Sequence, residues 1–307
     1  MVKARATSLG REMEAHAGVH PAYPPITRTG RLTIAAVPIG QPDDASARLR
    51  AALQEAPVIA AEDTRRIRRL ATALGIRLPG RIVSYYDEVE SRRVPVLLAE
   101  LQSGRDVLLV TDAGMPGVSD PGYRLVAAAA DAGVPVSVLP GPSAVTTALV
   151  ISGLPCDGFV FEGFPPRRAG ERARRFAELA AERRTLVFFE SPRRLAVTLT
   201  ELAAAFGPDR RAAVCRELTK THEEVLRGPL GELAEAAQGG VLGEITLVIE
   251  GARAGAGTVS LPEAVRQVAA RVEDGVPRRD AIAAVAAELG LARRELYNEV
   301  VRGLSAQ

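Results

Sequence analysis

Short apolar runs alternate with longer amphipathic stretches along this chain from Arg31 onward, most regularly in the first half. The apolar runs have the length of buried strands, and they cover residues 32–37, 58–62, 81–86, 106–111 and the first part of 134–145. The amphipathic stretches repeat with helical spacing, and they cover residues 44–55, 64–74, 92–102 and 123–132. This alternation predicts an α/β fold in which helices cover a largely parallel sheet.

The pattern changes after residues 140–143, where the apolar runs become aromatic, as in FVFEGF and TLVFFE. The strands expected in this second half lie at 159–164, 185–190, 211–217 and 244–250, with a hairpin-like segment at 221–228. A change of this kind after a Gly/Pro-rich turn is typical of a domain boundary.

Four regions are therefore expected along the chain. Residues 1–30 have no apolar segment of signal-peptide length and are predicted to form a poorly ordered tail. Two α/β domains follow, at 31–141 and 142–253. Residues 254–307 start in the linker-like stretch GARAGAGT and continue as a small helical module, whose pattern breaks at DGVPRRDA.

Composition and charge limit the function less than the motifs do. The 307 residues carry 39 basic and 37 acidic side chains, so a net charge of +2 demands neither nucleic acid nor membrane, and any basic surface must be local. Cys156 and Cys215 are isolated, which disfavours a disulfide framework and a structural zinc site and fits the cytoplasm. No run of about 18 apolar residues predicts a membrane span, and no metal is expected.

Three turns rich in glycine and proline each follow an expected strand: VPIG (37–40), DAGMPG (112–117) and LPGPSA (139–144). Such turns let the backbone approach a ligand at the carboxyl edge of an open α/β sheet. None of them matches the GxGxxG or GxxxxGK[ST] pattern, so the usual dinucleotide and P-loop sites are excluded. We expect a different small-molecule site at this edge.

Nine motifs in order carry a family resemblance: VPIGQPDD, AAEDTRR, SYYDE, TDAGMPGVSDPGYRLV, LPGPSAV, FVFEGFPP, FFESPRR, RELTKTHEE and GEITLVIEG. Over residues 32–251 the chain resembles the ribosomal RNA small subunit methyltransferase I family of the tetrapyrrole methylase superfamily. The resemblance implies a two-domain class III methyltransferase that uses S-adenosylmethionine. It also implies a homodimer that methylates the ribose 2'-oxygen of cytidine 1402 in 16S rRNA of the 30S subunit.

The resemblance further implies that S-adenosylmethionine binds in a cleft between the domains. Asp112 is suited to a ribose hydroxyl or the ammonium group, although it is equally suited to capping a turn. The residues that the resemblance assigns to cofactor binding are Pro38, Gly40, Asp112, Gly114, Met115, Pro116, Ser119, Ser143, Ala144 and Thr246. Three positions depart from the family pattern, because Val37, Met115 and Tyr86 stand where Thr, Thr and His are common, and catalysis is therefore not assigned to them.

The ribose hydroxyl is a very weak acid, so a group must take its proton. Lys220, Glu217 and Asp63 are the leading candidates among the ionisable groups of the motifs, which also include Glu190 and His222. Lys220 suits this role if burial lowers its pKa, but a surface pair between Glu217 and Lys220 is the simpler alternative. Asp63 is also the expected N-cap of the helix that follows it.

Arginine clusters near aromatic strands are candidates for binding RNA phosphates. They comprise Arg65, Arg66, Arg167, Arg168, Arg193 and Arg194. The neighbouring Phe161, Phe164, Phe188 and Phe189 are more typical of a sheet core than of base stacking. Two other functions stay open at this point: a small-molecule methyltransferase acting on a tetrapyrrole, and a non-catalytic ribosome-binding factor.

Overall fold

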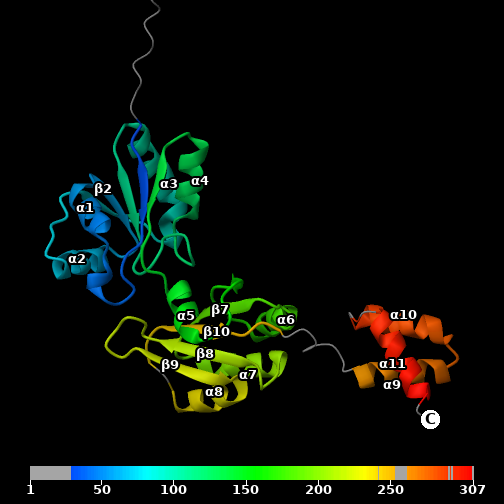
Figure 1. Ribbon diagram of the computed structural model, residues 1–307. Helices are drawn as coiled ribbons and strands as arrows, with labels where there is room; N and C mark the ends of the chain where they lie inside the picture. The colour runs from blue at the N-terminus through cyan, green and yellow to red at the C-terminus, as the bar shows by residue number, and fades with distance from the viewer. Residues whose placement is uncertain (1–28, 241, 253–260, 290, 292, 306–307) are drawn as a thin grey trace, which may run out of the picture.

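Two five-stranded sheets and a three-helix module make up the computed structural model of the protein (Figure 1). The structure describes residues 29–240, 242–252, 261–289, 291 and 293–305. Most of the tail expected at 1–30 and the centre of the expected linker lie outside the described residues. The α/β class predicted from the sequence is confirmed.

The first sheet is parallel throughout, as the alternation of strands and helices predicts. Its strands run in the spatial order β3-β2-β4-β1-β5. Their bounds are β1 Leu32–Ala35, β2 Val58–Ala61, β3 Arg81–Ser84, β4 Val107–Val110 and β5 Val136–Leu139. Strands β2 and β4 are buried along their whole length, because helices cover both faces of the sheet.

Four helices cover the first sheet, two on each face. They are α1 Ala47–Glu55 and α2 Thr64–Ala73 on one face, and α3 Asp87–Gln102 and α4 Tyr123–Asp131 on the other. Helix α1 begins later than its pattern suggests, because Pro42–Asp44 form a separate 3-10 turn and Ser46 caps the helix. Helix α3 begins earlier, at a first turn rich in acidic residues that favour a helix N-terminus.

The second sheet is mixed, with the order β6-β7-β10-β8-β9, and only β6 and β7 pair in parallel. Its strands are β6 Phe159–Phe161, β7 Thr185–Glu190, β8 Arg211–Arg216, β9 Glu224–Pro229 and β10 Ile245–Ile249. The expectation of largely parallel pairing is therefore wrong for this half. The hairpin between β8 and β9, and the placement of β10 between β7 and β8, impose antiparallel neighbours.

Helices again cover both faces of this second sheet. Helices α6 Ala169–Leu179, α7 Leu195–Phe206 and α8 Leu230–Ala236 pack on one face, with the short 3-10 turn Ala237–Gly239. Helix α5 Ala144–Ser152 packs on the other face, against β8 and β10. Because β5 ends at Leu139 and α5 already belongs to the second core, we propose a domain boundary at 140–143.

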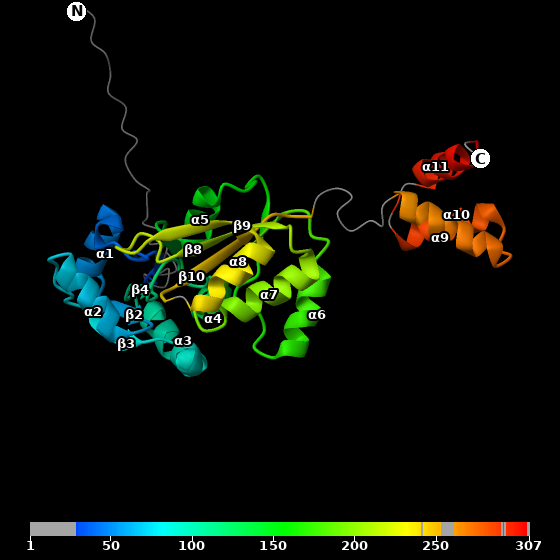
Figure 2. The same ribbon diagram turned by 90° about the horizontal axis from the view of Figure 1, so that it is seen from below.

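The helical module consists of α9 Leu261–Glu273, α10 Arg278–Glu288 and α11 Arg293–Ser305. Its own apolar core includes Val268, Ile282, Val285 and Leu296, all fully or almost fully buried. Figures 1 and 2 place these helices apart from both sheets. The break predicted near DGVPRRDA falls between α9 and α10, although α10 already starts at Arg278.

Candidate active site

The three Gly/Pro turns meet at the carboxyl edge of the first sheet. Val37 and Gly114 exchange two backbone hydrogen bonds of 2.9 and 3.1 Å, which joins the first turn to the second. The third turn lies against the first, because the Ala36 N–H donates to Leu139 O at 3.0 Å and a Cβ on Gly141 would sit 3.0 Å from the Ala36 Cβ. Chain segments that are distant in sequence thus form one rim.

A cavity of about 440 Å³ lies between this rim and the second sheet. Its walls come from both halves of the chain, and they include the mainly apolar side chains of Ile39, Met115, Val145, Leu218 and Ile245. One end is acidic, because Glu62 from the end of β2, Asp112 from the end of β4 and Asp120 from the following loop all line it. The combination suits a small molecule with an apolar body and a positive charge.

Most carboxylates of this cavity are engaged by a donor or a cation. Glu62 accepts the Asp112 N–H at 3.1 Å, and Asp112 accepts the Asp63 N–H at 2.9 Å and pairs with Arg66 at 3.3 Å. Within the described part of the chain, Asp120 has no hydrogen-bond donor and no ion-pair partner. Asp120 is therefore the carboxylate whose interactions are left for a ligand.

Burial raises the pKa of Asp120 to about 7, with further contributions from the negative charges of Glu62, Asp112 and Asp87. The pKa of Glu62 is also raised, mainly by burial. Three acidic groups around one cavity end face a single arginine, Arg66. With a pKa of about 7, the Asp120 carboxyl changes protonation near neutral pH, which is the property required of a general base.

The loop that carries Asp120 is held in an unusual backbone conformation. Ser119 has φ 61°, and Gly117 and Gly122 have φ 84° and 149°. Buried Glu90 fixes the end of this loop, because its Oε1 accepts the Gly122 N–H at 3.0 Å and the Tyr85 hydroxyl at 2.9 Å. Left-handed φ at a non-glycine residue costs energy and persists only where the surroundings enforce it. The loop thus presents Asp120 in one fixed orientation.

Seven of the ten residues assigned to cofactor binding line the cavity: Asp112, Gly114, Met115, Ser119, Ser143, Ala144 and Thr246. Pro38, Gly40 and Pro116 are not among the residues that line it in the described structure. Pro38 and Pro116 are buried behind the rim. Gly40 lies against the turn after β8, where a Cβ would sit 2.5 Å from Lys220 Cγ and 2.9 Å from Leu218 O. The absence of a side chain at Gly40 therefore allows the two halves of the chain to approach each other closely at this junction.

The three candidates for proton transfer lie just outside the cavity lining. Lys220 pairs with Glu217 at 2.8 Å and with Glu244 at 3.0 Å. Burial lowers the pKa of Lys220, but the hydrogen bonds to both glutamates outweigh it, and the net pKa is raised. The hypothesis of a lysine with a lowered pKa is therefore wrong. The hydrogen bond from Lys220 in turn lowers the pKa of Glu217.

Asp63 is the N-cap of helix α2, which is the simpler of the two roles expected for it from the sequence. Its carboxylate accepts the Arg65 N–H at 2.7 Å and pairs with the Arg65 guanidinium at 2.8 Å. This side-chain pair and the backbone hydrogen bond keep the pKa of Asp63 well below its usual range. A carboxylate held in this way is a weak proton acceptor.

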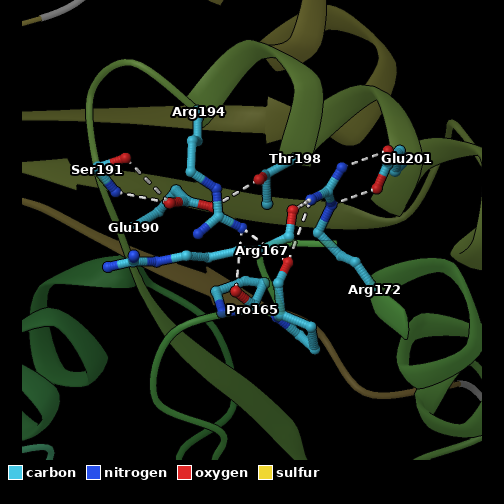
Figure 3. A network of polar contacts seen from close by, with 9 residues as sticks. Pro165, Arg167, Arg172, Glu190, Ser191, Arg194, Thr198 and Glu201 are labelled. Carbon is cyan, nitrogen blue, oxygen red and sulfur yellow. Dashed lines mark hydrogen bonds and ion pairs between the residues drawn. The ribbon is translucent and has the colours of Figure 1, made fainter. Parts of the chain in front are cut away.

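The six arginines proposed for RNA binding differ in how free they are. Arg65, Arg167, Arg168 and Arg193 are exposed, although Arg65 pairs with Asp63 and Arg168 pairs with Glu171 at 3.2 Å. Arg66 lines the cavity itself and pairs with Asp112. Arg194 instead donates to the carbonyls of Pro165 and Pro166 at 3.0 Å each and pairs with buried Glu190 at 3.6 Å (Figure 3). Arg194 thus holds the 165–168 loop in place. Arg167 contributes a carbonyl oxygen to this network while its side chain extends away from it (Figure 3).

Two features of the site could not be found from motif spacing. Asp120 stands in the same glycine-rich loop as Asp112, and nothing in the sequence separates a partnered from an unpartnered carboxylate. Phe164 was expected in a sheet core, yet it is 57% exposed, lines the cavity and lies 5.6 Å from the Phe189 ring. Phe188 is buried, as expected.

No group of three or more His, Cys, Asp or Glu side chains in the described ranges is arranged to hold a metal ion. Among the described helices, none combines the length and the apolar character needed to cross a membrane.

Comparison with known sequences gives consistent matches over most of the chain. A family model described as tetrapyrrole (corrin/porphyrin) methylases matches residues 31–234. A protein of Mycobacterium tuberculosis (strain CDC 1551 / Oshkosh) named ribosomal RNA small subunit methyltransferase I is 58% identical over 275 residues, covering 89% of this chain and 95% of the relative. Proteins of the same name from Halalkalibacterium halodurans and Escherichia coli O157:H7 are each 39% identical, and they cover 88% and 87% of this chain and 94% and 93% of their own.

Solved structures share the fold at lower identity. The methyltransferase CobJ matches with a TM-score of 0.56 and 22% identity, covering 74% of this chain and 98% of its own. A uroporphyrin-III C-methyltransferase from Thermus thermophilus, solved in complex with S-adenyl homocysteine, matches with a TM-score of 0.51 and 22% identity over 71% of this chain and 96% of its own. These likenesses show the fold alone.

Proposed function

This chain belongs to the tetrapyrrole methylase family and, within it, to the ribosomal RNA small subunit methyltransferase I proteins, and on that premise we propose that it methylates the ribose 2'-oxygen of a cytidine in 16S rRNA. Its methyl donor is S-adenosylmethionine. The observation that carries the proposal is a two-sided cavity with an acidic end whose mouth is flanked by exposed arginines.

The residues of the cavity fit S-adenosylmethionine. A volume of about 440 Å³ falls within the usual range of small-molecule sites. The apolar walls around Met115, Val145 and Ile245 suit the nearly neutral adenosyl group. The acidic end formed by Glu62, Asp112 and Asp120 suits the positive sulfonium and ammonium groups. The same negative end favours the charged donor over the uncharged thioether that remains after transfer.

The protein's own part in the reaction is to align the ribose and to accept its proton. When bound, S-adenosylmethionine supplies a methyl group on a positively charged sulfur, and alignment provides much of the acceleration of such a displacement. We propose that Asp120 accepts the proton of the 2'-hydroxyl, because Asp120 lines the cavity, has no hydrogen-bond donor among the described residues, and has a pKa of about 7. Lys220 and Glu217, which form an ion pair, brace the turn behind the cavity.

We propose that the arginines around the opening of the cavity bind the phosphates of the RNA. Arg66 lines the cavity, Arg193 follows Pro192 of the lining, and Arg167 and Arg168 lie on the loop after Phe164. Guanidinium groups bind phosphate in a bidentate manner, and exposed Phe164 offers a ring on which a displaced base can stack.

We further propose that the protein acts in the cytoplasm on the assembled 30S subunit and does so as a homodimer. Strand β5 lies at the edge of the first sheet and exposes Val136 and Val138 by 40% and 49%. Apolar side chains at a free sheet edge are typical of a surface that a second subunit covers.

The test of the function is transfer of a tritiated methyl group from S-adenosylmethionine to 30S subunits that lack the modification. We expect label in 16S rRNA, and nuclease digestion followed by mass analysis should yield 2'-O-methylcytidine. Unlabelled 30S with intact binding of S-adenosylmethionine would contradict the rRNA assignment and favour a small-molecule methyltransferase. Tight 30S binding without any affinity for S-adenosylmethionine would indicate a non-catalytic ribosome-binding factor.

Gly40→Ala should weaken binding of S-adenosylmethionine. The added Cβ would clash with Lys220, Thr219 and Leu218 across the junction, and it would strain the hydrogen bond from the Gln41 N–H to Thr219 Oγ1. Overpacking of this kind costs about 1–3 kcal/mol of folding stability. Displacing the turn that carries Leu218 of the cavity lining should also weaken binding of the donor, and isothermal titration calorimetry measures that loss. Gly170→Ala, where a Cβ meets no atom within 4 Å, is the control and should bind like the wild type.

A further inference from the structure

The helical module carries a hollow on its surface that is separate from the cavity between the sheets. It measures about 260 Å³ and is lined by Arg278, Arg279 and Ile282 from α10 and by Arg293 and Tyr297 from α11. The three arginines are exposed, and the Tyr297 side chain is 53% exposed. The floor is apolar, because Ile282 is buried in the core of the module.

These arginines differ from others in the same module. Arg266 pairs with Glu263, and Arg302 pairs with Glu299 at 2.9 Å. In the described part of the chain, Arg278, Arg279 and Arg293 have no hydrogen-bonded or ion-paired carboxylate. Three cations that are brought together without a counter-charge repel one another, so the arrangement favours an anionic ligand.

Acidic residues of the same two helices lie away from the hollow. Asp280 follows Arg278 by two positions, and Glu295 follows Arg293 by two. At about 100° per residue, a separation of two positions turns a side chain roughly to the far side of its helix. The hollow therefore presents positive charge on one face, although residues 261–305 contain equal numbers of acidic and basic side chains, seven of each.

We propose that this face, formed by Arg278, Arg279, Arg293 and Tyr297, binds the sugar–phosphate backbone of the substrate RNA at a place distinct from the methylated nucleotide. The inference rests on the proposed function for the nature of the RNA. Guanidinium groups pair with phosphate in two parallel hydrogen bonds, and an exposed tyrosine beside them adds a surface for stacking an unpaired base. A second contact on the same chain raises the effective concentration of substrate at the cavity.

The experiment compares two double variants of the full-length protein that remove the same charge from the same module. Arg278→Ala with Arg279→Ala removes two arginines of the hollow, and Arg266→Ala with Arg302→Ala removes two paired arginines as the control. Binding to 30S subunits and to protein-free 16S rRNA is measured at several salt concentrations, together with kcat, the KM for 30S and the Kd for S-adenosylmethionine.

We expect the hollow variant to raise the KM for 30S and the Kd for free rRNA about tenfold, with kcat and the Kd for S-adenosylmethionine unchanged. Each lost phosphate contact should also reduce the slope of log K against log salt by about 0.7–0.9, so the two substitutions should lower it by roughly 1.5. The control variant should stay within about twofold of the wild type, since exposed pairs contribute little. Tyr297→Ala should weaken rRNA binding without changing the salt slope.

Equal behaviour of the two double variants would overturn the proposal. Weaker binding to 30S with wild-type binding to free rRNA would also overturn it and would point to an acidic ribosomal protein as the partner. Binding to free rRNA is read without methyl transfer, so failure of the proposed reaction and failure of this binding face give different results.

Discussion

Replacing Asp120 by asparagine is expected to lower kcat for methyl transfer by about 100-fold or more, which is the usual contribution of a general base. The amide keeps the size of the side chain but cannot take the proton of the ribose hydroxyl. Fixed-time assays with saturating S-adenosylmethionine and 30S subunits measure this loss. Calorimetry should show that the variant still binds the donor, because Glu62 and Asp112 remain at the acidic end.

The same assignment predicts the pH dependence of the wild-type enzyme. The base must be ionised, so kcat/KM should be low below pH 7 and rise with pH to a plateau, with the midpoint near the Asp120 pKa of about 7. Bound S-adenosylmethionine is positively charged and lowers this pKa, so the midpoint for kcat should lie at lower pH. The Asp120→Asn variant should not show this rise in rate with pH.

Asp87→Asn provides the matched control for this profile. Asp87 is exposed and lies outside the cavity lining, but its negative charge contributes to the raised pKa of Asp120. Its removal should move the midpoint of the profile to lower pH and leave the plateau rate unchanged. A full plateau rate for Asp120→Asn, or a wild-type profile without a limb near pH 7, would exclude Asp120 as the base.

Arg172→Met is expected to cause the largest loss of stability. Arg172 is buried, and its Nε and Nη2 donate to the two Glu201 oxygens at 2.5 and 2.6 Å (Figure 3). Its Nη1 also donates to the carbonyls of Pro166 and Arg167 at 3.1 Å each. Breaking a buried pair costs about 3–5 kcal/mol, because one charge stays behind without a partner.

Thermal unfolding measures this effect, and the midpoint should fall by about 6 °C or more. The loop that carries Arg167 would also lose an anchor, so the KM for 30S should rise.

Arg174→Met is the control, because Arg174 is exposed and its pair with Glu178 spans 3.8 Å. This variant should change the free energy of unfolding by no more than about 0.5 kcal/mol. Replacing Arg172 and Glu201 together by methionine should restore part of the loss. Equal midpoints for the two single variants would contradict the assigned role of Arg172.

Much of the fold followed from the sequence, since helices, strands and tight turns depend on short-range patterns. The order of strands and helices in the first half is confirmed, and Gly75 follows the end of α2 with a left-handed φ of 67°. Strand pairing in the second half was beyond this approach, because β7 and β10 are far apart in sequence and a short apolar run does not reveal its neighbours.

The sequence by itself determined the α/β class, the three Gly/Pro turns and the family, because periodicity, backbone freedom and ordered motifs are properties of neighbouring residues. The tertiary structure decided which charged groups remain available. Arg194 and Lys220 are engaged by carboxylates, whereas Asp120 and the arginines of the α10–α11 hollow are left without partners among the described residues. Ion pairing, burial and the pKa of a side chain depend on groups that folding brings together from distant segments, and no local pattern records those encounters.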